Sequence, residues 1–128
     1  MDAEHGLMST PALVSEKEFQ ATVIEMAHAF GWKVYNQLDT GRCPKCGNPN
    51  WSKRVGPGFP DLVMAHPERG FIIFAELKSA TGQVSKEQKD WLDALSGTGV
   101  KLGPYYHPIV RLWRPSDWPE IERILQGE

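Results

Sequence analysis

Two carboxylates and one amine stand close together in the middle of the chain. Asp61 follows Gly58-Phe59-Pro60, and Glu76 and Lys78 end a strongly apolar run. Carboxylate oxygens are the usual ligands of Mg²⁺, and the backbone C=O of Leu77 is a plausible further ligand. A cation held there would lower the pKa of a bound water and polarise a phosphate, while Lys78 would either orient the attacking water or stabilise developing negative charge. The set therefore predicts hydrolysis of phosphodiester bonds, with Asp61, Glu76 and Lys78 as catalytic residues.

The same three residues also have a structural interpretation. Asp61 is a common residue type in a turn after proline, and Glu76 with Lys78 would form an ion pair on one face of an exposed strand. However, the run Phe71–Ala75 is strongly apolar, and charges at its end beside a second charged strand terminus favour a functional site.

A long segment over about 39–59, rich in Gly and Pro, carries Cys43-Pro44-Lys45-Cys46-Gly47. A pair of thiols at this spacing is half of a tetrahedral zinc site. His5, His66 or His107 would supply a further ligand, or a second chain would contribute its own cysteine pair. The alternative is that the two thiols bind no metal.

The same segment contains basic residues and a tryptophan. The formal net charge of −2 argues against a protein that coats nucleic acid by bulk electrostatics, so any contact with nucleic acid must be local. The basic residues either solvate the loop or form an arm that follows phosphates and stacks a ring on a base. The candidate DNA-binding residues are Arg42, Lys45, Trp51, Lys53 and Arg54.

The elements that must position these residues can be predicted from hydrophobic periodicity and capping patterns. Ser15-x-x-Glu18 predicts a capping box that opens a helix, which ends at Gly31. Trp32–Leu38 alternates like a half-buried strand, and the strands Asp61–Ala65 and Phe71–Lys78 form a hairpin around a turn at 66–70. Glu76 and Lys78 then share one face.

The second half of the chain predicts more helix and strand. Ser85-x-x-Gln88 is another capping box, for a helix that ends near 97–99. Strand pieces follow at Val100–Leu102 and Ile109–Trp113, and Ser116-Asp117 with Glu120 is expected to cap a last helix. The predicted order is α, β, β, β, α, β, α, an α/β fold with a mixed sheet flanked by helices. Trp91, Trp113 and Trp118 are expected in the core.

Length and composition predict one domain. The 128 residues are 41% hydrophobic, so we expect a loose lead-in at 1–14 and a single domain over 15–128. No apolar run approaches the roughly 20 residues needed to cross a bilayer. The N-terminus lacks a secretory pattern, so a cytoplasmic protein without membrane association is expected.

The pattern Pro60-Asp61 followed by Glu76-Leu77-Lys78 resembles the PD-(D/E)xK nuclease superfamily, and its surroundings resemble the VRR-NUC family in particular. The similarity covers roughly residues 15–125. It is carried by Glu18, Gly58-Phe59-Pro60-Asp61-Leu62, Ala75-Glu76-Leu77-Lys78, Gly82, Ser85, Gln88, Trp91 and the closing segment Val110–Pro115.

This resemblance implies a restriction-endonuclease-like core and an endonuclease that depends on Mg²⁺ or Mn²⁺. It also implies a homodimer that acts on branched DNA, as Holliday junction resolvases do. It places Glu18 among the metal ligands and Gln88 in the active site, although both residues are equally explained by their capping boxes. The CxxC loop departs from a minimal member and leaves substrate preference open. Two rival functions stay open, a DNA-structure-binding module that does not cut and a zinc-stabilised interaction protein.

Overall fold

The computed structural model describes residues 14–36, 57–98 and 107–127, and within them it places four strands in one mixed sheet. The strand order is β1-β2-β3-β4; β1 with β2 and β2 with β3 are antiparallel, whereas β3 and β4 are parallel. The elements are α1 (Glu16–Ala29), β1 (Lys33–Asn36), β2 (Leu62–His66), β3 (Phe71–Leu77), α3 (Lys86–Ser96), β4 (Ile109–Trp113), the 3-10 helix η4 (Pro115–Asp117) and α4 (Trp118–Gln126). The predicted α/β fold, a mixed sheet flanked by helices, is confirmed and is consistent with a restriction-endonuclease-like core.

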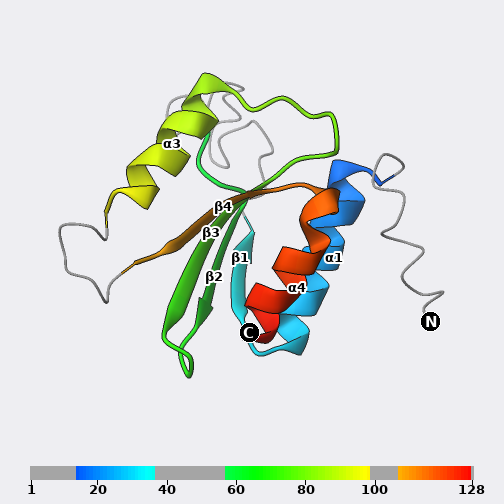
Figure 1. Cartoon of the computed structure of the whole chain (residues 1–128), viewed down its shortest axis with the longest axis vertical. Helices are drawn as coiled ribbons and strands as arrows, with labels where there is room; N and C mark the ends of the chain where they lie inside the picture. The colour runs from blue at the N-terminus through cyan, green and yellow to red at the C-terminus, as the bar shows by residue number, and fades with distance from the viewer. Residues whose placement is uncertain (1–13, 37–56, 99–106, 128) are drawn as a thin grey trace, which may run out of the picture.

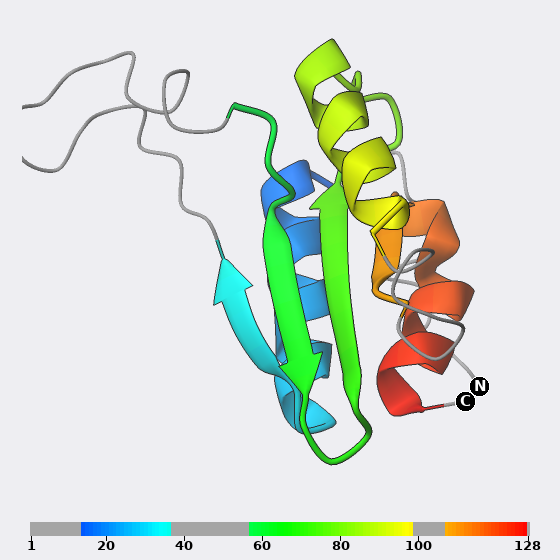
Figure 2. The same ribbon diagram turned by 90° about the vertical axis from the view of Figure 1, so that its left-hand side faces the viewer.

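The helices cover the two faces of the sheet unequally. Helices α1 and α4 pack side by side on one face, while α3 lies apart from them, against β3 and β4 (Figures 1 and 2). The core fills the space between α1, α4 and the sheet, where alternate strand residues point inward. Its fully buried members include Phe19, Val23, Leu62, Met64, Ile73, Leu77, Trp113, Ile121 and Leu125.

The register of the hairpin brings the two candidate carboxylates together. Leu62 pairs with Ala75 across the antiparallel β2–β3 ladder. Asp61 immediately precedes Leu62, and Glu76 immediately follows Ala75, so the same register places Asp61 opposite Glu76. On the other side of β3, Lys78 N donates to Trp113 O over 3.0 Å, which extends the parallel β3–β4 ladder to Lys78. All three residues of the predicted catalytic set therefore lie at one end of the sheet.

The hairpin is fixed to the C-terminal helix at the opposite end of the sheet. Arg69 donates to Leu125 O and Ile124 O, each over 3.0 Å, and its guanidinium lies over the Trp32 ring, 5.1 Å from the centroid. Trp32 Nε1 also donates to Leu125 O. These bonds satisfy carbonyls that the end of a helix leaves without partners.

Two details of the prediction are wrong. Trp91 is half-buried rather than part of the core, because α3 buries none of its residues fully. Of the other two tryptophans expected in the core, Trp113 is a core residue, and Trp118 is partly buried and packs against the core. Asp117 does not cap α4 with Glu120. Instead, Asp117 Oδ2 accepts from Arg114 N, and Glu120 Oε1 accepts from Trp113 Nε1. The predicted strand piece at 100–102 and most of the lead-in lie outside the described residues.

Within the described ranges, no helix is both long and apolar enough to span a membrane.

Candidate active site

Asp61 is held by the backbone of the neighbouring strand. Its Oδ2 accepts a hydrogen bond from Leu77 N over 2.9 Å. This bond orients the carboxylate toward the end of β3, while the Leu77 side chain is fully buried in the core beneath it. The backbone of Leu77 is thus part of the site, in the position where its C=O was predicted as a ligand.

Glu76 is the most unusual residue of the site, because it is a carboxylate that is only 1% exposed. Its Oε2 accepts from Gln88 Nε2 over 2.8 Å and lies 3.7 Å from Lys78 Nζ. Its Oε1 is buried and has no hydrogen-bond partner among the described residues. Buried polar atoms are nearly always satisfied, so a carboxylate oxygen buried beside a second carboxylate needs either a proton shared with Asp61 or a bound cation.

The electrostatics of the pair fit a bound cation. Burial, and next the neighbouring Asp61 carboxylate, raises the pKa of Glu76 from 4.5 to about 8, although the Lys78 ammonium opposes this change. Two adjacent carboxylates with little access to water repel each other unless a proton or a cation lies between them. All the donors are oxygens, which is the chemistry that Mg²⁺ and Mn²⁺ prefer. The residues present therefore fit the metal that the fold implies.

The raised pKa of Glu76 predicts that the metal-free protein loses stability with rising pH. A carboxyl group with a pKa of 4.5 in the unfolded chain and about 8 in the folded protein binds more protons in the folded state between these pH values. The free energy of unfolding in EDTA should therefore fall from about pH 5 to about pH 8. Glu76→Gln should remove this slope and stabilise the metal-free protein at pH 8, by up to about 4 kcal/mol.

Urea unfolding of both proteins across this pH range checks the prediction. Glu68→Gln, at an exposed position in the hairpin turn, is the control for the loss of one negative charge. A wild-type slope that Glu76→Gln leaves intact would show that Glu76 is not the titrating group.

Gln88 completes its capping box and also contacts Glu76. Its Oε1 accepts from Ser85 N over 2.9 Å, and Ser85 Oγ accepts from Gln88 N, so the capping box is complete. With Oε1 engaged there, Nε2 must point the other way, and it donates to Glu76. The cap of α3 thus fixes the orientation of the amide that holds the buried carboxylate.

Glu18 is not brought to the carboxylate pair. Its Oε1 accepts from Ser15 N over 3.1 Å in the complete capping box of α1, and the residue is exposed. The described part of the chain contains no group of three or more His, Cys, Asp and Glu residues placed to hold a metal ion. Glu16 of the same first turn lies near enough to contribute to the raised pKa of Glu76.

The segment before Asp61 holds α3 over the site. Gly58 has φ +86 and approaches the first turn of α3 so closely that a Cβ there would lie 2.6 Å from the Glu87 carbonyl carbon. Only glycine combines this conformation with this approach. Phe59 then packs edge-on against Trp91, with ring centroids 4.9 Å apart, and against Phe74. Gly58 and Phe59 therefore position Gln88 opposite Glu76.

The predicted zinc and DNA-binding residues lie outside the described residues: Cys43, Cys46, Arg42, Lys45, Trp51, Lys53 and Arg54, together with His5. His66, one of the three histidines considered as a further zinc ligand, is described. It is a buried strand residue whose Nε2 bonds to Phe30 O over 2.9 Å and whose Nδ1 accepts from Arg69 N. Both ring nitrogens are engaged, so neither is free to bind zinc.

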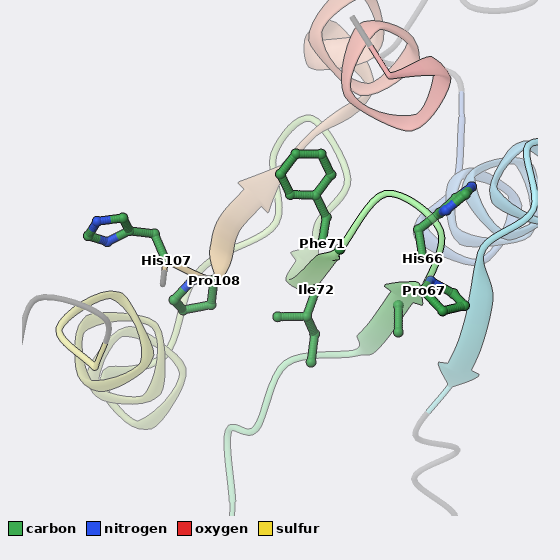
Figure 3. Close-up of a pocket in the computed structure, with 8 residues that line it drawn as sticks. His66, Pro67, Phe71, Ile72, His107 and Pro108 are labelled. Carbon is green, nitrogen blue, oxygen red and sulfur yellow. The ribbon is translucent and has the colours of Figure 1, made fainter. Parts of the chain in front are cut away.

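A cavity of about 470 Å³ lies at the hairpin end of the sheet (Figure 3). Its wall includes His66 and Phe71, which pair with each other at the end of the β2–β3 ladder opposite to Asp61 and Glu76. His107 and Pro108, just before β4, complete one side. The cavity is therefore separated from the carboxylate pair by the length of the strands and does not contribute to that site.

Comparison with protein families shows that the model of the VRR-NUC domain matches residues 18–104. The match spans the carboxylate pair, Lys78 and Gln88. No curated protein and no solved structure matches the chain.

Proposed function

This chain belongs to the VRR-NUC family of nuclease domains, and we propose that it is a metal-dependent DNA endonuclease whose active site is built on Asp61, Glu76 and Lys78. The observation that carries the proposal is the buried Glu76 beside Asp61 and 3.7 Å from Lys78, with an Oε1 that finds no hydrogen-bond partner in the described part of the chain. A stable core has no need of such a group, and a hydrolytic centre does.

Asp61 and Glu76 would hold the cation, with the C=O of Leu77 as a further candidate. When bound, Mg²⁺ or Mn²⁺ supplies Lewis-acid polarisation of the phosphate and a water of lowered pKa. The protein contributes preorganisation: Leu77 N fixes Asp61, and Gln88 fixes Glu76. Groups held by such neighbours need little reorganisation during the reaction.

Lys78 contributes positive charge at the reacting phosphate. Its side chain is 13% exposed, and its Nζ lies beside Glu76 Oε2. An ammonium group donates hydrogen bonds, so it could serve either predicted role, to the attacking water or to the phosphate; we propose charge stabilisation. Its N–H groups would bind the oxygens of the phosphate as negative charge grows on them.

Gln88 offers a test of how Glu76 is oriented. Gln88→Glu keeps a capping-box acceptor for Ser85 N but places a carboxylate against Glu76 in place of a donor. We expect a loss of about 10- to 100-fold in cleavage rate at fixed metal concentration with little loss of stability. Gln88→Ala should lose both the cap and the orientation, so its melting temperature should also fall.

Initial rates and thermal melts of both variants check this. Lys89→Ala, an exposed substitution on the same helix, is the control. Unchanged rates in Gln88→Glu would limit Gln88 to its capping role.

For the substrate, we propose branched DNA bound by a homodimer, as the family resemblance implies. The DNA contacts of the basic loop around Trp51 and the zinc site at Cys43 and Cys46 stay predictions, because that loop lies outside the described residues. The single domain over 15–128 also stays a prediction.

The function is tested by incubating the protein with end-labelled four-way junction, flap, duplex and single-stranded DNA, and with RNA, in Mg²⁺, Mn²⁺ or EDTA. Metal-dependent cutting of branched DNA supports the proposal; binding of branched DNA without cutting would favour the recognition-module alternative.

A further inference from the structure

Arg114, the first residue after β4, makes contacts that neither the core nor the metal site explains. Its Nη1 donates to Ser79 O over 2.7 Å and to Gly82 O over 2.9 Å. The residue lies outside the segment 18–104 matched by the family model. One nitrogen of a side chain at the end of β4 therefore binds two carbonyls of the segment that follows β3.

The segment bound by Arg114 is a turn that packs on the catalytic amine. Gly82 N donates to Ser79 O over 3.3 Å and closes the turn. A Cβ at Gly82 would lie 3.4 Å from Lys78 Cδ and 3.2 Å from Ser79 Oγ, so the backbone of Gly82 lies directly against the Lys78 stem. The position of the turn thus restricts the conformations open to that stem.

The side chain of Lys78 is only 13% exposed, so neighbouring residues enclose its long stem, and the Gly82 backbone is one of them. Its backbone N–H donates to Trp113 O, the residue just before Arg114, and its Nζ lies 3.7 Å from Glu76 Oε2. The stem between these two points has several rotatable bonds, so the packing around it decides where the ammonium lies.

We propose that Arg114 is a positioning residue, which closes the Ser79–Gly82 turn over the stem of Lys78 and so holds the amine beside Glu76. The proposal deepens the proposed function and rests on it, because it assigns Arg114 to the catalytic reaction through Lys78. Charge-assisted bonds from a guanidinium to two carbonyls are well suited to fix a turn, because they are stronger than neutral ones and keep a defined geometry.

Arg114→Ala should lower kcat by about 10- to 100-fold with little change in KM, because a displacement of the amine by about 1 Å is enough for such a loss. Arg114→Lys should recover part of kcat, since an ammonium can also donate to both carbonyls. Arg69→Ala is the matched control: it also removes an arginine that binds two backbone carbonyls, but at the opposite end of the sheet. Its kcat per folded molecule should stay at the wild-type value.

A second readout does not depend on catalysis. The ¹³C and ¹H shifts of the Lys78 ε-methylene in metal-free protein should move toward those of a free lysine in Arg114→Ala and stay unchanged in Arg69→Ala. If Arg114→Ala does not fold, Arg114→Gln, which is too short to reach both carbonyls, is measured in the same way.

The outcomes separate the two proposals. A wild-type protein that cuts no nucleic acid would overturn the proposed function, while the Lys78 shifts would still test the positioning. Wild-type kcat in Arg114→Ala, equal losses in Arg114→Ala and Arg69→Ala, or unchanged Lys78 shifts would overturn the role of Arg114.

Discussion

Asp61→Asn is expected to lower the rate of metal-dependent cleavage by about 1000-fold or more and to leave the fold intact. The side chains have the same shape, so the Asn oxygen can still accept from Leu77 N, and its amide can donate to Glu76. What the substitution removes is the negative charge that a cation needs. Steady-state rates on the best DNA substrate, together with a thermal melt, measure both parts of the prediction.

Asparagine is a sharper test here than alanine. Asp61→Ala would leave Leu77 N without its partner at a cost of about 1–3 kcal/mol, so a loss of rate could reflect a loss of folded protein. Asp90→Asn, on the exposed side of α3, is the matched control for the same chemical change. Activity of Asp61→Asn within tenfold of wild type would remove Asp61 from the metal site.

Lys78→Met is expected to lower kcat by about 100- to 1000-fold. Methionine keeps an unbranched stem against Gly82 and loses the ammonium beside Glu76, so the change is mainly one of charge. It also removes the positive charge of Lys78, which lowers the pKa of Glu76. The pKa of Glu76 should therefore rise further in this variant. Single-turnover cleavage at saturating Mg²⁺ separates the chemical step from metal and DNA binding.

Lys86→Met is the control for Lys78→Met, because Lys86 is an exposed lysine on α3 that pairs with Asp90. If Lys78→Met kept its single-turnover rate while cleavage still required metal, the amine would have no part in the chemical step.

The sequence was sufficient to place Asp61 beside Glu76, because the decisive features are local. The alternation of β2 and the apolar run of β3 define a hairpin, and a hairpin fixes its own register. Once Leu62 is paired with Ala75, Asp61 and Glu76 have no other place to lie. The capping boxes at Ser15 and Ser85 are likewise local patterns, and both are present in full.

The contacts between distant segments could not be read in this way. The capping boxes that contain Glu18 and Gln88 look alike in sequence, but only the one in α3 brings its third helical residue, Gln88, against Glu76. This depends on the packing of Gly58 and Phe59 against the helix. Arg114 reaches its two carbonyls only after β4 has paired with β3. His66 was expected in the turn at 66–70, and its bond to Phe30 O could not be foreseen because that carbonyl lies at the end of α1.

Divalent-metal binding tests the central claim without requiring the preferred DNA to be known. Mn²⁺ titrated calorimetrically into EDTA-stripped wild-type protein at pH 7, in two buffers of different ionisation enthalpy, should bind saturably and release protons. The release is expected because Glu76, with a pKa of about 8, must lose its proton when the cation binds. Asp61→Asn should abolish this binding; equal binding in the wild type and Asp61→Asn, or none in the wild type, would contradict a metal site at Asp61 and Glu76.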